Sequence, residues 1–106
     1  MRSICIFCGS SPGNRPEYVE LARTTGRLVA GRGLTLVYGG GKVGLMGQVA
    51  DAALPAGGRV VGVMPEDLVN QEIAHRGLSE LHVVQSMHER KRIMFEESDG
   101  FVVLPG

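Results

Sequence analysis

The sequence lacks the features that define several common classes of protein. It contains no tryptophan, and no apolar run approaches the roughly 20 residues that a membrane-spanning helix needs. The first apolar run, residues 4–8, is too short for a signal peptide. Because 11 basic and 11 acidic side chains cancel, overall charge does not indicate a nucleic acid polymer or a membrane surface as partner. We expect a cytoplasmic protein whose residues 1–106 form one domain.

Cysteine is scarce as well, and its two copies do not indicate a metal or redox site. Cys5 and Cys8 spell C-x-x-C, a pattern that can hold zinc or perform thiol exchange. They lie in an expected strand, where positions i and i+3 face opposite sides, and no nearby Cys or His completes a zinc set. His75, His82 and His88 are scattered without metal spacing. We expect buried thiols and no bound metal.

Glycine, in contrast, is abundant and gathers in one stretch. Of 16 glycines, five fall close together: Gly39, Gly40, Gly41, Gly44 and Gly47. They follow the apolar run 34–38 and precede the helical pattern 45–54, so they join a strand to a helix. Glycine permits positive φ, which we expect at Gly41, and lets backbone N–H groups approach an anion, which a helix start also attracts. The stretch predicts a phosphate-binding loop.

Other interpretations of this stretch stay open. Gly39, Gly41 and Gly44 match the G-x-G-x-x-G fingerprint of dinucleotide-binding proteins, but that fingerprint follows the first strand of its fold, whereas this stretch follows the second. An oxidoreductase of that kind would use Glu66 to bind the ribose. The P-loop pattern fails because Lys42 is not followed by Ser or Thr. A tight turn that only packs a helix on a strand is the structural alternative.

Apolar runs and turn residues alternate in a pattern typical of α/β proteins. Strands are expected at 4–8, 34–38, 59–63, 81–85 and 101–104, and helices at about 16–30, 45–54 and 87–98. This alternation predicts a parallel sheet. A parallel sheet needs helices on both faces. Three helices are few for five strands, which suggests that the sheet pairs with another chain or belongs to a larger domain. The long connection 64–81 is expected to be functional.

Two further segments are expected at the carboxyl edge of the sheet, where ligands bind in open α/β folds. The turn at 9–13 offers the hydroxyl of Ser10, although a plain loop explains it equally well. The helix at 87–98 begins with Ser86 as its N-cap and Glu89 as capping-box partner. Asn14 is expected to cap the helix at 16–30.

Three cations follow one another in the first turns of the helix at 87–98: Arg90, Lys91 and Arg92. Cations are poorly placed there, because the helix dipole favours anions at that end. This placement suggests that Arg90 binds a phosphate or a carboxylate in bidentate fashion. The alternative is a solvated basic face balanced by Glu96 and Glu97.

Taken together, six motifs resemble the LOG ("lonely guy") family of cytokinin riboside 5′-monophosphate phosphoribohydrolases, members of which were long labelled lysine decarboxylases. The motifs occur in one order from Ser3 to Gly106: Phe7-Cys-Gly-Ser-Ser11, Val37-Tyr-Gly-Gly-Gly41, Gly44-Leu-Met-Gly47, Gly62-Val-Met-Pro65, Met87-His-Glu-Arg-Lys91 and Asp99-Gly-Phe-Val-Val-Leu-Pro-Gly106. The resemblance implies a Rossmann-like doubly wound fold, usually dimeric, that hydrolyses an N6-substituted adenosine 5′-monophosphate to free base and ribose 5-phosphate without a cofactor.

The resemblance also assigns roles to individual positions. Arg90 matches the catalytic arginine of the family, and Lys91 matches the substrate-binding residue beside it. Glu72 matches an acidic substrate-binding position, and Met87 matches a methionine at the base end. The glycines from Gly39 to Gly47 match walls of the nucleotide pocket, together with Ser10 and Gly106.

The sequence departs from the family pattern at its end. The family signature continues from Leu-Pro-Gly into a second glycine and then x-Gly-Thr-x-x-Glu, whereas this sequence stops at Gly106. The resemblance assigns a phosphate-binding loop and a catalytic glutamate to that segment. Because glycosidic cleavage passes through an oxocarbenium-like state that a carboxylate can support, we expect weak or no turnover from residues 1–106. A non-catalytic nucleotide-binding or carrier module on the same fold remains the alternative.

Overall fold

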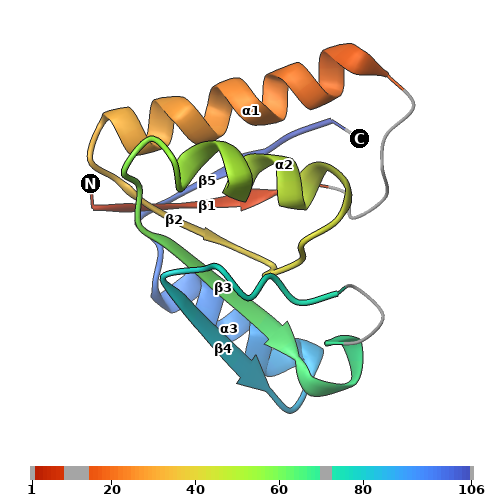
Figure 1. Cartoon of the computed structure of the whole chain (residues 1–106). Helices are drawn as coiled ribbons and strands as arrows, with labels where there is room; N and C mark the ends of the chain where they lie inside the picture. The colour runs from red at the N-terminus through yellow and green to blue at the C-terminus, as the bar shows by residue number, and fades with distance from the viewer. Residues whose placement is uncertain (1, 9–14, 70–72, 106) are drawn as a thin grey trace.

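The fold is described by a computed structural model for residues 2–8, 15–69 and 73–105. Its elements, in chain order, are β1 (Ser3–Phe7), α1 (Pro16–Gly31), β2 (Thr35–Tyr38), α2 (Gly44–Ala53), β3 (Val60–Pro65), the short 3-10 helix η1 (Glu66–Leu68), β4 (Glu80–Val84), α3 (Met87–Glu96) and β5 (Gly100–Val103) (Figure 1). The expected strands and helices are confirmed, with boundaries close to those that the apolar pattern predicts.

All neighbouring strands of the sheet are parallel, and their order is β4-β3-β2-β1-β5. The chain therefore builds the sheet outward from β1 to β4 and then returns to the other side of β1 for β5. The helices α1 and α2 lie on one face of the sheet and α3 on the other (Figure 1). This arrangement confirms the doubly wound α/β prediction. In such sheets ligands bind at the carboxyl edge, near the point where the strand order reverses.

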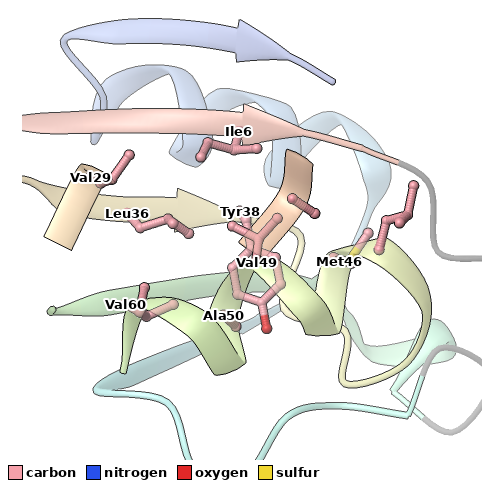
Figure 2. Close-up of a cluster of buried hydrophobic side chains, with 11 residues drawn as sticks. Ile6, Val29, Leu36, Tyr38, Met46, Val49, Ala50 and Val60 are labelled. Carbon is pink, nitrogen blue, oxygen red and sulfur yellow. The ribbon is translucent and has the colours of Figure 1, made fainter. Parts of the chain in front are cut away.

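The central strands β1, β2 and β3 bury side chains on both faces, which explains their unbroken apolar runs, whereas the edge strands β4 and β5 are more exposed. Toward α1 and α2, a cluster contains Ile6, Leu36, Tyr38, Val49 and Val60 (Figure 2). Toward α3, a second cluster contains Cys5, Val37, Val61, Val63, Val84 and Met94. Neighbours along β1 and β2 thus alternate between the two clusters, as the period of a strand requires.

The two faces are covered to different extents. On the first face α1 and α2 pack so closely that a Cβ at Gly26 would overlap the carbonyl oxygen of Val49. On the second face, three aromatic rings stack near the edge strand β5 and remain partly exposed. Phe101 lies 5.3 Å from Phe95 and 6.2 Å from Phe7 between ring centroids. Phe7 and Phe101 on the strands are 39% and 43% exposed, so α3 covers this corner of the sheet only in part.

The first helix starts with the proline that the sequence predicts. Pro16 occupies the first turn of α1, where its missing N–H costs nothing. Arg15 occupies the N-cap and makes no side-chain capping bond, so the expectation that Asn14 caps this helix is wrong; Asn14 itself lies outside the described residues. None of the helices in the described ranges is long and apolar enough to cross a membrane.

Candidate functional site

The glycine loop, defined here as Gly39–Val43, runs from the end of β2 to the start of α2. Hydrogen bonds from several elements hold its backbone, among them Tyr38 Oη–H to Gly41 O (2.8 Å), Gly41 N–H to Met46 Sδ (3.2 Å), Lys42 N–H to Ile73 O (2.8 Å) and His75 N–H to Gly40 O (2.9 Å). The loop is therefore fixed from three sides: by its own strand, by α2, and by the connection between β3 and β4. Contacts within the fold therefore determine the shape of the loop.

The structure shows which of the consecutive glycines need to be glycine. Gly40 has φ of 88°, a conformation that residues with a Cβ rarely adopt. A Cβ at Gly39 would overlap the guanidinium of Arg90, so the arginine can keep its position only beside a glycine. The expectation of a positive φ at Gly41 is wrong. The turn that needs positive φ falls one residue earlier, where His75 N–H meets the Gly40 carbonyl.

The start of α2 places the backbone N–H groups of a helix N-terminus next to this loop. Its N-cap, Val43, makes no side-chain capping bond, and the first N–H groups of a helix have no acceptor within the helix. Gly47 lets the first turn approach the loop closely, because a Cβ there would overlap the Lys42 carbonyl. The positive end of the α2 dipole therefore lies at the glycine loop, which is the arrangement that binds anions.

Arg90 connects α3 to the glycine loop across the end of β3. The residue is only 8% exposed. Its Nε–H donates to the Val63 carbonyl at 2.9 Å, and its Nη2–H donates to the Gly39 carbonyl at 2.7 Å. The guanidinium also contacts Met87, whose Sδ lies 3.8 Å from Nη1. A buried cation thus lies beside the glycine loop, where the sequence analysis expects a charged group.

The two cations that follow Arg90 on α3, Lys91 and Arg92, are exposed. Met87 is 47% exposed. Arg92 pairs with Glu96 at 3.0 Å on the solvent side, so the solvated basic face considered above accounts for Arg92 but not for Arg90. The expected N-cap is confirmed, because the Ser86 hydroxyl accepts the Glu89 N–H at 3.1 Å.

Three predicted site residues lie outside the described residues: Ser10, Glu72 and Gly106. The structure therefore brings together the glycine loop, Arg90 and Met87, and places Lys91 on the same helix at the surface. The catalytic and binding roles of these residues remain predictions.

A second polar pair beside the loop was not predicted. His75 is buried, and its Nε2 lies 2.7 Å from Asp51 Oδ1 on α2. Burial raises the pKa of the nearby Tyr38 hydroxyl, and the Asp51 carboxylate raises it further. No sequence motif links Asp51 with His75, because the two residues meet only in the tertiary structure, through the β3–β4 connection. The pair can therefore be recognised only from burial and distance in the structure.

Cys5 is buried, as expected, whereas Cys8 is only half-buried. Both are free, and burial raises the pKa of Cys5 and of Cys8 to about 11. At neutral pH both are therefore protonated and poor nucleophiles. Within the described ranges, no group of three or more His, Cys, Asp or Glu side chains is placed to hold a metal ion.

These features define the class of the protein as a Rossmann-like α/β protein with a glycine-rich loop and a buried arginine at the carboxyl edge of its sheet. A family described as "Possible lysine decarboxylase" matches residues 46–106. The chain is 53% identical over 106 residues to the cytokinin riboside 5′-monophosphate phosphoribohydrolase of Rhodococcoides fascians and 49% identical over 104 residues to the enzyme of that name from Mycobacterium tuberculosis. The chain therefore belongs to the LOG family.

The matches cover this chain almost completely but not the relatives. They span 99% and 98% of the chain but 54% and 55% of the two relatives, so the chain spans about half the length of the curated relatives it matches. Among solved structures, the Moco carrier protein of Chlamydomonas reinhardtii superposes with a TM-score of 0.77 at 22% identity, over all of this chain and 64% of the carrier. At that identity the likeness concerns the fold alone.

Proposed function

We propose that residues 1–106 form the nucleotide-binding unit of a phosphoribohydrolase. The substrate is adenosine 5′-monophosphate or an N6-substituted analogue, and the products are the free base and ribose 5-phosphate. The relatives named as phosphoribohydrolases, about half identical to this chain, support the reaction class. The observation that carries the proposal is the 2.7 Å hydrogen bond from Arg90 Nη2 to the Gly39 carbonyl. This bond joins the two segments that the sequence analysis assigns to substrate.

In the proposed reaction, the bond between ribose C1′ and the base nitrogen breaks, and its electron pair leaves with the base. A water oxygen forms the new bond to C1′, and one water proton ends on the base. The transition state has oxocarbenium character at the sugar and growing negative charge on the base. A guanidinium can stabilise negative charge on the phosphate or on the leaving base, and this is the role proposed for Arg90.

Binding of the phosphate is proposed for the glycine loop and the start of α2. Gly39, Gly40, Gly41, Gly44 and Gly47 shape the wall, and the α2 dipole favours the anion. Met87, Lys91, Glu72, Ser10 and Gly106 are proposed as further substrate contacts on the family resemblance. The carboxylate that supports the oxocarbenium is assigned by that resemblance to the segment after Leu-Pro-Gly, so turnover is proposed for a chain that carries this segment.

The test measures base release and nucleotide binding in the same preparations. The intact mass of the purified protein is determined first, and free adenine from AMP is then quantified by chromatography. The assay uses this chain and a chain extended after Gly106 by the corresponding segment of the Rhodococcoides fascians relative. Adenine release by the extended chain supports the proposal. AMP binding without release would instead support a nucleotide carrier, absence of binding by both chains would contradict both functions, and binding of NAD in preference to AMP would favour the dinucleotide alternative.

The proposal includes a cytoplasmic homodimer. Two free cysteines agree with a reducing compartment, and the exposed stack of Phe7, Phe95 and Phe101 is an apolar surface of the kind that protein contacts cover. Sedimentation velocity of the extended chain tests the dimer, and a monomer at micromolar concentration would contradict it.

A further inference from the structure

His75 is tied at both ring nitrogens. Its Nδ1 accepts the Gly77 N–H at 3.0 Å, so this nitrogen carries no proton. The proton therefore resides on Nε2, which donates to Asp51 Oδ1 at 2.7 Å. Asp51 belongs to α2, the helix that begins directly after the glycine loop, and its side chain is 60% exposed. A buried ring from the β3–β4 connection is thus held to a helix 24 residues earlier in the chain.

The same connection forms a short ladder with the glycine loop. Lys42 N–H donates to the Ile73 carbonyl, and His75 N–H donates to the Gly40 carbonyl. Gly41 and Ala74 are the antiparallel bridge between these two bonds. A ladder of two hydrogen bonds is marginal on its own, so an anchor at one end determines whether it stays closed. The bond from His75 to Asp51 provides that anchor.

The backbone of this segment is strained, which is a second and independent sign that it is held in place. Ile73 has φ of 51°, whereas β-branched residues strongly avoid positive φ. Such strain persists only where the surroundings fix the conformation, and it is concentrated at functional sites. The strained residue is the one whose carbonyl receives the Lys42 N–H.

We propose that Asp51 and His75 are positioning residues for the glycine loop. Their hydrogen bond fixes residues 73–75, and the ladder then fixes Gly40 and Lys42. The adjacent Gly39 carbonyl, which accepts from Arg90, is held in register with the start of α2. The inference rests on the proposed function, because it assigns the pair a role in binding a nucleoside 5′-monophosphate without contact to it.

The test compares Asp51→Ala with Asp51→Asn. Both variants remove the same negative charge, but only asparagine keeps an oxygen that accepts from His75 Nε2. AMP affinity is measured by calorimetry, and exchange of the Lys42 and His75 amides is measured by NMR. We expect Asp51→Ala to weaken AMP binding about fivefold and to speed both exchange rates by a similar factor, as the loss of one hydrogen bond implies. Asp51→Asn is expected to stay within about twofold of the parent in both measurements, a difference below the effect of a single hydrogen bond.

A matched control is Asp67→Ala, which removes an exposed aspartate from η1 in the same connection. It should leave both measurements unchanged. Equal AMP affinity and equal exchange in Asp51→Ala and Asp51→Asn would overturn the proposal, as would faster exchange with unchanged affinity. If the parent protein binds no AMP, the proposed function fails separately. In that case the amide exchange rates alone test whether the Asp51–His75 pair holds the glycine loop. Equal exchange rates in Asp51→Ala and Asp51→Asn would then show that it does not.

Discussion

The helices α2 and α3 both begin at the carboxyl edge of the sheet, yet their first turns are built in opposite ways. The first turn of α2 is buried, contains Gly44 and Gly47, and has no side-chain cap at Val43. The first turn of α3 is mostly exposed, and its N-cap Ser86 accepts a hydrogen bond from the backbone. The N-cap side chain of α3 thus accepts one of the first backbone N–H groups of its helix, whereas the N-cap side chain of α2 accepts none.

In the proposed function the two helix starts contribute different groups. The helix α3 supplies a side-chain cation, Arg90, which reaches back to the loop before α2. The helix α2 supplies closely packed backbone and the positive end of its dipole. The contrast predicts two kinds of effect on AMP binding and turnover. On α3, a mutation should matter when it removes the charge of Arg90. Around α2, a mutation should matter when it adds a side chain to the glycine loop or an anion to the helix start.

The largest effect is expected from removing the charge on α3. Arg90→Ala, in the chain extended by the segment after Gly106, should lower turnover of AMP about 100-fold or more, as loss of a charged transition-state contact typically does. Single-turnover release of adenine is the measurement. The variant also loses two hydrogen bonds to backbone carbonyls, so circular dichroism must first establish that it is folded. Substantial residual turnover in a folded variant would remove Arg90 from the site.

The next effect concerns space in the glycine loop. Gly39→Ala places a Cβ against the Arg90 guanidinium and within 3.0 Å of Met46 Cε, so the arginine must move. We expect AMP affinity to fall about tenfold, as for a charge-assisted contact of roughly 1.5 kcal/mol. The matched control is Gly31→Ala, where a new Cβ meets nothing within 4 Å. Equal affinities in the two variants would show that Arg90 does not need its present position.

Much of the fold could be predicted from the sequence because its signals are local. Apolar runs followed by Gly, Pro or Ser mark the strands, and the capping box at Ser86 marks the start of α3. The glycine stretch and Arg90 could be predicted as parts of one site, because parallel strands deliver their following segments to the same edge.

What could not be predicted depends on the path of the chain in three dimensions. Gly39, Gly40 and Gly41 are equivalent in sequence, and the positive φ falls at Gly40 because the β3–β4 connection bonds its carbonyl. His75 and Asp51 meet for the same reason. The β3–β4 connection has no periodicity that indicates which of its residues face the glycine loop. Its contacts with the loop and with Asp51 therefore follow only from interatomic distances in the structure.

A smaller effect is expected from supplying α2 with its own anion. Val43→Asp puts a carboxylate at the α2 N-cap, where it competes with phosphate for the same backbone donors and field. We expect AMP affinity to fall about threefold to tenfold, with the loss diminishing at high salt, while stability rises by about 0.5 kcal/mol. Calorimetry at two salt concentrations measures the affinity. Val43→Asn is the neutral control, and an equal loss in that variant would exclude electrostatic competition.

The smallest functional effect is expected at the start of α3, where the cap is structural. Ser86→Ala removes the hydroxyl that accepts the Glu89 N–H, and loss of such a cap costs about 1 kcal/mol of unfolding free energy. AMP affinity should remain within about twofold of the parent, a change smaller than the loss of one hydrogen bond, because Arg90 is held by the Val63 and Gly39 carbonyls and not by the cap. Urea unfolding and calorimetry on the same sample separate the two quantities. A loss of affinity larger than the loss of stability would mean that the α3 start also binds the nucleotide, and the division between the two helices would then be wrong.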